Sequence, residues 1–147
     1  MLKAITKKIE NIKGVLIHGP SGIGKTMAIE QVLSKFQEQI TVVKLQPSDL
    51  VKEEDQFKLV QKSFKTAAAA DPSILLIEEI DFIAKNSKTG KDLFYGLLGE
   101  MDKFGGSLII ATTNKLDDLP KSMRRGGRLD IDIRMDMPTS TDRFGIF

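Results

Sequence analysis

The residues best suited to chemistry lie in one stretch, residues 19–26, which reads GPSGIGKT. It fits the template Gly, four residues, Gly, Lys and Ser or Thr, in which backbone N–H groups hold phosphate oxygens. In this template the Lys25 ammonium reaches the β- and γ-phosphates and the Thr26 hydroxyl binds Mg²⁺. The residues that we expect to contact a nucleotide are Gly19, Pro20, Ser21, Gly22, Ile23, Gly24, Lys25, Thr26 and Met27.

Such a loop needs a strand before it and a helix after it, and the flanking sequence predicts both. Residues 15–18 form a short apolar run that is typical of a buried strand. The apolar residues Ile29, Val32, Leu33 and Phe36 recur at helical spacing, which predicts a helix from the loop to about Glu38. The positive end of that helix would then face the phosphates.

Three polar residues follow two further apolar runs. Glu78 and Glu79 come directly after residues 74–77, and Asn114 follows residues 108–111 and two threonines. At the carboxyl end of a strand beside the first, Glu78 would help to hold the hydration shell of Mg²⁺ and Glu79 would polarise an attacking water. The Asn114 amide is suited to bind both the γ-phosphate and that water, although a lone Asn is more often a turn former.

An arginine-rich segment lies near the end of the sequence, where residues 124–130 read RRGGRLD. Such a segment is usually a solvated surface. In a nucleotide hydrolase it is also the natural source of an arginine finger, which contributes roughly 10³ to 10⁵ in rate when it reaches the transferred phosphoryl group.

Apolar runs and helical patterns alternate along the whole chain. Residues 41–45 and 131–135 predict two more strands, the second an exposed edge strand on which charges alternate with apolar residues. Phe57, Val60 and Phe64 mark one face of a long helix, and a later helix turns Phe94, Leu97, Leu98 and Met101 to the core. The alternation predicts an α/β domain with a mostly parallel sheet and helices on both faces. Residues 2–10 predict a short amphipathic helix.

Length and composition are those of one soluble globular domain. The 147 residues carry 22 basic and 20 acidic side chains, a net charge of +2, and no cysteine. The charge gives no electrostatic footprint for nucleic acid. The absence of cysteine excludes disulfides and thiolate metal sites and suits the cytoplasm or another reducing compartment. Short apolar runs predict no membrane insertion.

Taken together, these motifs resemble the AAA family of ATPases, within the wider AAA+ group, over nearly the whole chain. Residues 13–20 look like the entry into the Walker A motif, and residues 77–81 (IEEID) look like Walker B. Residues 97–102 are similar to the helix before sensor 1, and residues 111–114 match sensor 1 itself. Residues 125–130 match the second region of homology, with Arg125 and Arg128 at the arginine-finger positions.

The resemblance implies a P-loop NTPase fold, a three-layer sandwich whose five-stranded parallel sheet has the order 5-1-4-3-2. It implies a domain that binds ATP or ADP with Mg²⁺ and hydrolyses ATP. Glu79, Asn114, Arg125 and Arg128 would be catalytic, and Thr26 and Glu78 would hold the metal. It further implies a ring, usually of six subunits, that remodels or disassembles protein partners. Arg125 and Arg128 would act on the neighbouring subunit's nucleotide, so an isolated subunit would turn ATP over slowly.

The sequence departs from the family pattern in three places. Glu78 stands where the family usually has Asp, and one extra methylene displaces a carboxylate that Mg²⁺ holds in a strict octahedron. Residues 50–55 lack the aromatic residue with which many members grip a threaded chain. The sequence also stops at Phe147, before the small helical lid, so we interpret residues 1–147 as a large ATPase subdomain from a truncated chain.

Two other functions stay open at this point. The first is a nucleotide-binding AAA module that hydrolyses ATP weakly and has a structural or regulatory role, which the Glu78 substitution favours. The second is an AAA+ protein that acts on DNA, which is the weaker alternative because no basic stripe or stacking aromatics accompany the motifs.

Overall fold

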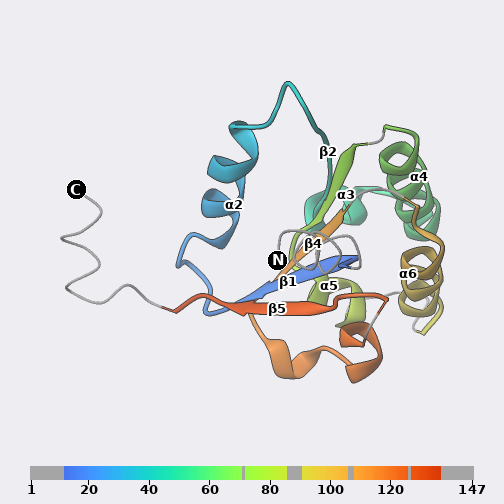
Figure 1. The fold of residues 1–147 in the computed structure, drawn as a ribbon. Coiled ribbons are helices and arrows are strands. Elements are labelled where there is room, and N and C mark those ends of the chain that lie inside the picture. Colours follow the sequence, from blue (N-terminus) through green and yellow to red (C-terminus); the bar gives the residue numbers. More distant parts are fainter. Residues whose placement is uncertain (1–11, 71, 86–90, 106–107, 126, 137–147) are drawn as a thin grey trace.

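Five parallel strands form the centre of the molecule (Figure 1). The computed structural model describes residues 12–70, 72–85, 91–105, 108–125 and 127–136. Within these ranges the sheet has the order β2-β3-β4-β1-β5. This order confirms the prediction, since it is 5-1-4-3-2 read from the other edge. The strands are β1 (Gly14–His18), β2 (Thr41–Leu45), β3 (Ser73–Ile77), β4 (Leu108–Thr113) and β5 (Ile131–Arg134).

The register brings the carboxyl ends of the strands to one edge of the sheet. His18 at the end of β1 lies opposite Thr113 at the end of β4, and Ile77 at the end of β3 lies opposite Ala111. Each segment that follows a strand therefore starts near the segments that follow its neighbours. The predicted loop, acidic pair and Asn114 all leave the sheet on this edge.

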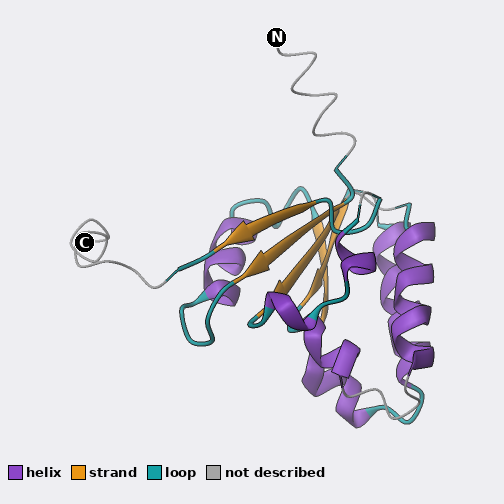
Figure 2. Cartoon of the chain, turned by 90° about the horizontal axis from the view of Figure 1, so that it is seen from below, coloured by secondary structure: helices purple, strands orange, loops and turns teal. Residues whose placement is uncertain are grey.

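Helices flank the sheet on both sides (Figures 1 and 2). α4 packs on β2 and β3 and also against α6, while α2 lies on the opposite side of the sheet. The helices are α2 (Lys25–Ser34), α3 (Pro47–Lys52), α4 (Gln56–Ala69), α5 (Ile80–Lys85) and α6 (Lys91–Lys103), with two short 3₁₀ turns, η1 (Leu116–Asp118) and η2 (Lys121–Arg124). The helix predicted over residues 2–10 and the C-terminal residues 137–147 lie outside the described residues.

The hydrophobic core lies between the sheet and the α4–α6 layer. β3 is buried along its whole length, as its uninterrupted apolar run predicts. Leu97 and Met101 of α6 are fully buried, and the Phe64 ring of α4 meets the Phe104 ring edge to face with centroids 5.5 Å apart. Burial of these apolar side chains is the main force that holds the layer on the sheet.

The prediction for α2 is wrong about where the helix ends. The helix ends at Ser34, four residues before Glu38, because Lys35 and Phe36 turn back to bond carbonyls three residues earlier. Of the apolar residues at helical spacing, Ile29 is buried, whereas Val32 is 55% exposed and Phe36 is 44% exposed. α2 contacts the sheet sparsely, so nothing in the described part of the chain covers these two exposed side chains.

Phe57 differs from Val60 and Phe64, which share its predicted helix face and are buried. The side chain stays partly exposed at the start of α4, where its ring lies against the backbone of α6 at Gly96. A Cβ at Gly96 would lie 2.3 Å from that ring. Gly96 thus permits the close approach of α4 and α6, and the Phe57 ring covers the edge of the core.

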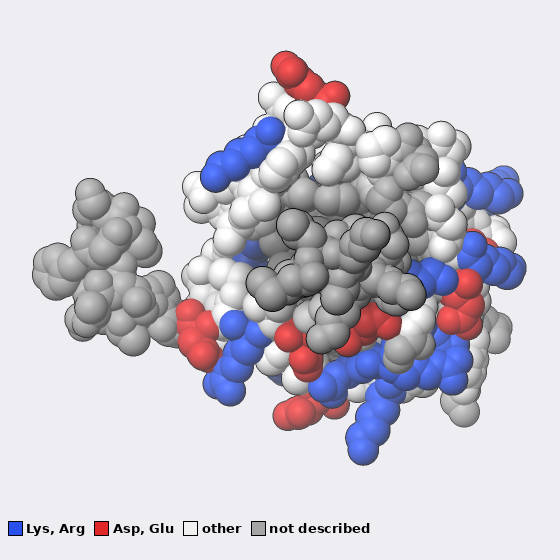
Figure 3. Space-filling view, in the orientation of Figure 1, with Lys and Arg blue, Asp and Glu red and all other residues white. Residues whose placement is uncertain are grey.

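No helix in the described residues is long and apolar enough to cross a membrane. On the face shown in Figure 3, Lys and Arg side chains lie interspersed with Asp and Glu. The mixed charge agrees with the small net charge of the sequence.

Candidate nucleotide-binding site

The phosphate-loop residues leave β1 in a tight turn and enter α2 without an intervening segment. The Gly19 N–H donates to the Thr113 carbonyl at 3.3 Å, which fixes the start of the loop to the end of β4. Gly22 and Gly24 have φ values of 82° and 87°, in the left-handed region that side chains other than glycine rarely adopt. α2 then begins at Lys25. The loop therefore ends at the positive pole of a helix, as an anion site requires.

Lys25 is the most buried charged group of the loop, with 7% of its surface exposed. Its ammonium donates to the carbonyl oxygens of Gly19 and Pro20, both at 2.7 Å. Burial lowers the pKa of Lys25, while the nearby charges of Asp81 and Glu79 act in the opposite direction. A cation that has lost much of its hydration gains strongly from an anion placed beside it.

A pocket of about 420 Å³ brings the loop together with residues from two other strands. We call it the loop pocket. Glu79 after β3 and Asn114 after β4 reach it, as predicted, although they lie far from the loop in sequence. Its lining residues are Ser21, Gly22, Gly24, Lys25, Thr26, Met27, Glu30, Glu79, Thr112 and Asn114.

The remaining loop residues have structural positions beside this pocket. Gly19 and Pro20 supply the carbonyls that hold Lys25. Gly19 also passes so close to β5 that an added Cβ would lie 2.1 Å from the Met135 carbonyl oxygen and 2.9 Å from Cδ1 of Ile23. Glycine is therefore required at position 19 for close approach of the backbone.

A second pocket, of about 330 Å³, lies on the other side of Thr26. We call it the acidic pocket, because both Glu78 and Glu79 line it. The backbone N–H of Glu78 donates to the Leu45 carbonyl at 2.9 Å, so β2 fixes its position. Glu78 is 8% exposed, and its Oε1 atom has no hydrogen-bond partner among the described residues. The other lining residues are Thr26, Gln46, Pro47 and Ser48.

The acidic pocket fits Mg²⁺ by the chemistry of its donors. Glu78, whose buried Oε1 atom has no hydrogen bond among the described residues, lines this pocket together with Thr26, and carboxylate and hydroxyl oxygens suit Mg²⁺. The described residues contain no group of three or more acidic or histidine side chains that would hold a metal alone. Mg²⁺ in proteins is commonly held by one or two protein ligands together with phosphate oxygens and water.

Glu79 adopts an unusual backbone conformation, with φ of 50°. A non-glycine residue at positive φ is strained and is held there by its surroundings. Its N–H donates to the Thr112 hydroxyl at 3.0 Å, and the neighbouring Thr113 hydroxyl donates to the Asp81 carboxylate at 2.8 Å. These two bonds join the end of β3 to the end of β4 and aim the Glu79 side chain at the loop.

Sequence reasoning missed the roles of Thr112, Thr113 and Asp81. All three lie inside segments already singled out, the threonines at the end of β4 and Asp81 in the first turn of α5, yet their contacts depend on β3 and β4 being neighbours. The sequence feature that could have indicated these roles is the pair of threonines directly before Asn114.

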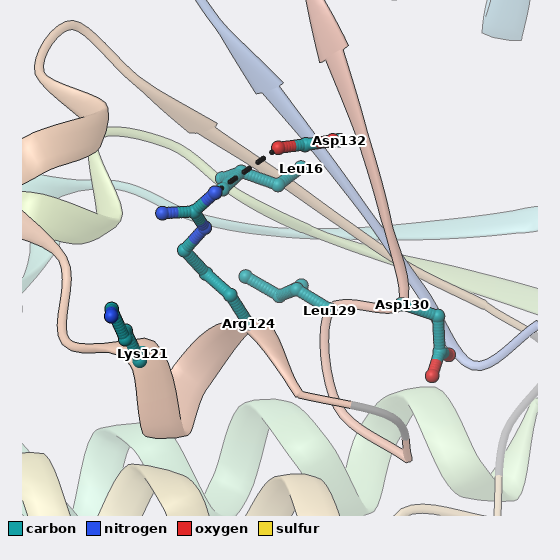
Figure 4. A pocket seen from close by; sticks show the side chains of 6 residues that line it. All are labelled: Leu16, Lys121, Arg124, Leu129, Asp130 and Asp132. Atoms are coloured by element: carbon teal, nitrogen blue, oxygen red, sulfur yellow. Dashed lines mark hydrogen bonds and ion pairs between the residues drawn. The ribbon is translucent and has the colours of Figure 1, made fainter.

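The arginine cluster, which we define as Arg124, Arg125 and Arg128, lies apart from both pockets. None of its members is among the lining residues of either. Arg124 forms an ion pair with Asp132 of β5 at 3.3 Å and borders a separate hollow of about 400 Å³ (Figure 4). Arg125 is exposed. Within the described residues, the chain thus does not bring this arginine cluster to its own loop.

Arg128 is 7% exposed and is bonded within the same chain. Its Nε and Nη2 atoms donate to the two carboxylate oxygens of Asp102, each at 2.9 Å, and Nη1 donates to the Ser122 carbonyl at 2.7 Å. This bidentate pair lowers the pKa of Asp102 and raises that of Arg128, in each case chiefly through the hydrogen bonds. The pair ties the segment before β5 to the end of α6.

Comparison with known proteins extends these findings. Residues 15–137 match the family model described as "ATPase family associated with various cellular activities (AAA)". The chain is 37% identical to proteasome-activating nucleotidase 2 of Halobacterium salinarum over 92% of its own length and 36% of that protein. It is 36% identical to the proteasome-activating nucleotidase of Archaeoglobus fulgidus over 95% of its length and 38% of that protein.

The chain therefore spans little more than a third of the length of these curated relatives. Within that span the match includes the loop, the acidic pair, Asn114 and the arginine cluster. The parallel sheet order and the loop at the end of β1 agree with the match. This chain belongs to the AAA family of ATPases.

Proposed function

We propose that this domain binds ATP with Mg²⁺ and hydrolyses it to ADP and phosphate. The observation that carries the proposal is the meeting of Lys25, Thr26, Glu79 and Asn114 in the loop pocket. These residues supply a cation, a hydroxyl, a carboxylate and an amide from three different strand ends. A phosphate loop alone would support binding, and the additional carboxylate and amide support hydrolysis.

Each residue has a role in the proposed reaction. Lys25 releases the Gly19 and Pro20 carbonyls and bonds phosphate oxygens, where its charge offsets the negative charge of the transferred group. Glu79 accepts a hydrogen bond from the attacking water and takes up its proton. Asn114 orients the same water without adding charge. Thr26 and Glu78 would hold Mg²⁺, which neutralises charge on the phosphates when bound.

The arginine cluster fits a role between subunits. Arg125 is exposed and lies outside its own loop pocket, so it is available to the nucleotide of a neighbour. We propose a ring, of six subunits as the family resemblance implies, in which Arg125 completes the adjacent site. The curated relatives are named proteasome-activating nucleotidases. By this likeness we propose that the assembled protein acts on protein substrates.

Substitution of the proposed base tests the hydrolytic role. In the ring-forming protein, Glu79→Gln should bind ATP as the unmodified protein does and lose about 10² to 10⁴ of its turnover, because the amide cannot accept the proton. Binding is measured with a fluorescent ATP analogue and turnover by phosphate release. Thr66→Ala, which changes an exposed side chain of α4, is the control. Turnover of Glu79→Gln equal to that of the control would remove Glu79 from this role.

A second candidate function is nucleotide binding with little hydrolysis. It is favoured by Glu78, whose longer side chain stands at the metal position and lies 3.8 Å from the Lys44 ammonium. Glu78→Asp distinguishes the two functions in the assembled protein. A large rise in turnover supports the binding module, and unchanged or reduced turnover supports a working ATPase.

A further inference from the structure

Lys44 links three elements that surround the acidic pocket. It lies on β2, and its Nζ atom is 2.5 Å from Glu30 Oε1 of α2 and 3.8 Å from Glu78 Oε1 after β3. The negative charge of Asp49 on α3 also acts on it. Lys44 is absent from the motifs that the sequence analysis singled out.

Glu78 depends on this ammonium for its charge balance. Its Oε1 atom is buried and has no hydrogen bond, and a carboxylate in such a place is costly unless a counter-charge is near. Lys44 is that counter-charge, at ion-pair distance from the same oxygen. The Lys44 side chain is 36% exposed, and Glu30 accepts a hydrogen bond from its ammonium, which helps to hold the cation near Glu78.

We propose that Lys44 is a resident cation of the acidic pocket, which supplies part of the positive charge that Mg²⁺ brings to the bound triphosphate. The inference rests on the proposed function, since it assumes that a nucleotide occupies the loop pocket. Lys44 lines neither pocket and lies beside the acidic pocket through its 3.8 Å approach to Glu78, so it acts through Glu78 and through its charge.

Coulomb's law gives Lys44 opposite effects on the two ligands. A fixed positive charge attracts the triphosphate and repels Mg²⁺. Removing the charge should therefore weaken nucleotide binding in the absence of Mg²⁺ and strengthen the binding of Mg²⁺ to the nucleotide complex. A merely structural role for Lys44 would weaken both together.

The test measures binding of a fluorescent, nonhydrolysable ATP analogue to the assembled protein, first in EDTA and then during a Mg²⁺ titration. Lys44→Met keeps the length of the side chain and removes its charge. In EDTA we expect this variant to bind the ATP analogue about threefold to tenfold more weakly. In the titration we expect its half-saturating Mg²⁺ concentration to fall by a similar factor. Both factors are the size of the interaction between two charges several ångströms apart near a protein surface. Lys44→Arg should stay close to the unmodified protein in both measurements.

Lys35→Met is the matched control, because Lys35 is exposed at the end of α2, away from both pockets. Equal behaviour of Lys44→Met and Lys35→Met would overturn the inference, as would a parallel loss of nucleotide and Mg²⁺ affinity in Lys44→Met. Failure of the unmodified protein to bind the analogue would instead contradict the proposed function. A thermal unfolding curve of each variant verifies that it is folded, and Lys44→Gln, which also removes the charge, takes the place of Lys44→Met if that variant is not folded.

Discussion

The loop pocket and the arginine cluster both serve phosphate chemistry in this proposal, yet the chain builds them differently. The loop pocket gathers residues from three strand ends into one space, and backbone bonds fix its parts. The arginine cluster lines neither the loop pocket nor the acidic pocket. Arg128 is buried in a bond with Asp102, Arg124 is paired on the surface with Asp132, and Arg125 is exposed.

The difference indicates that the loop pocket is assembled within one chain, whereas the arginine cluster needs a second chain to act on a nucleotide. In the proposed function, groups that this domain alone supplies hold the triphosphate. The charge that develops during transfer needs a further cation, and we propose that the exposed Arg125 supplies it to another copy of the chain. Arg128 then supports the segment that presents Arg125, because its three hydrogen bonds fix that segment to α6 and η2.

Arg125→Ala gives the largest expected effect and is the sharpest test of this division. In the assembled protein we expect turnover to fall by roughly 10³, the lower end of the range for arginine fingers, while nucleotide affinity and thermal stability stay unchanged. Mixing Arg125→Ala subunits with Glu79→Gln subunits should restore part of the turnover, because some interfaces then pair an intact base with an intact arginine. If the mixture stays inactive, Arg125 does not work across an interface and the comparison fails.

Lys25→Ala tests the loop pocket, and its effect should appear within a single subunit. We expect nucleotide affinity to fall roughly 10- to 100-fold, the value of charge-assisted hydrogen bonds to phosphate. Stability should change little, because in the described structure the ammonium bonds only the two loop carbonyls. Affinity is measured with the isolated domain and with the assembled protein. A loss seen only after assembly would show that the loop pocket is incomplete in one chain.

The sequence predicted the parts of this structure that depend on strand order and strand ends. A short apolar run such as residues 74–77 is typical of a buried strand, and polar residues that follow such a strand emerge at its carboxyl end. With the strand order that the family resemblance implies, Glu79 and Asn114 were expected beside the loop, and the structure places them there. The helical spacing of the α2 residues predicted a helix but does not show which of them another element covers. The structure buries Ile29 and leaves Val32 and Phe36 exposed.

Contacts between distant segments were beyond sequence reasoning. Arg128 and Asp102 are 26 residues apart, and Lys44 meets Glu78 only because β2 lies beside β3. A basic residue on an edge strand and an Asp at the end of a helix are both ordinary surface residues by composition. Their partners become visible only when the register of the sheet and the position of α6 are known.

Arg128→Ala should reduce stability and leave the loop pocket intact. It removes a bidentate pair and a third bond to the Ser122 carbonyl, and we expect the free energy of unfolding to fall by about 2 kcal/mol. Arg128→Lys should recover only part of this, since an ammonium cannot bind both carboxylate oxygens in one plane. Denaturant unfolding measures the loss, and ATP-analogue affinity of the isolated domain is the control. Affinity that falls as far as in Lys25→Ala would place Arg128 in the binding site.

Asp102→Asn gives the smallest effect and has a distinctive dependence on pH. Arg128 lowers the pKa of Asp102 below its ordinary value near 3.8, so the folded state favours the ionised carboxylate. The stability that this group contributes is present above the pKa of the unfolded chain and is lost as pH falls through the lower pKa of the folded state. Because the Asp102 side chain is 48% exposed, we expect less than about 1 kcal/mol. The difference in unfolding free energy between the unmodified protein and Asp102→Asn should therefore be constant above pH 5 and shrink below pH 4, and a difference that grows on acidification would show that the pair does not stabilise the ionised form.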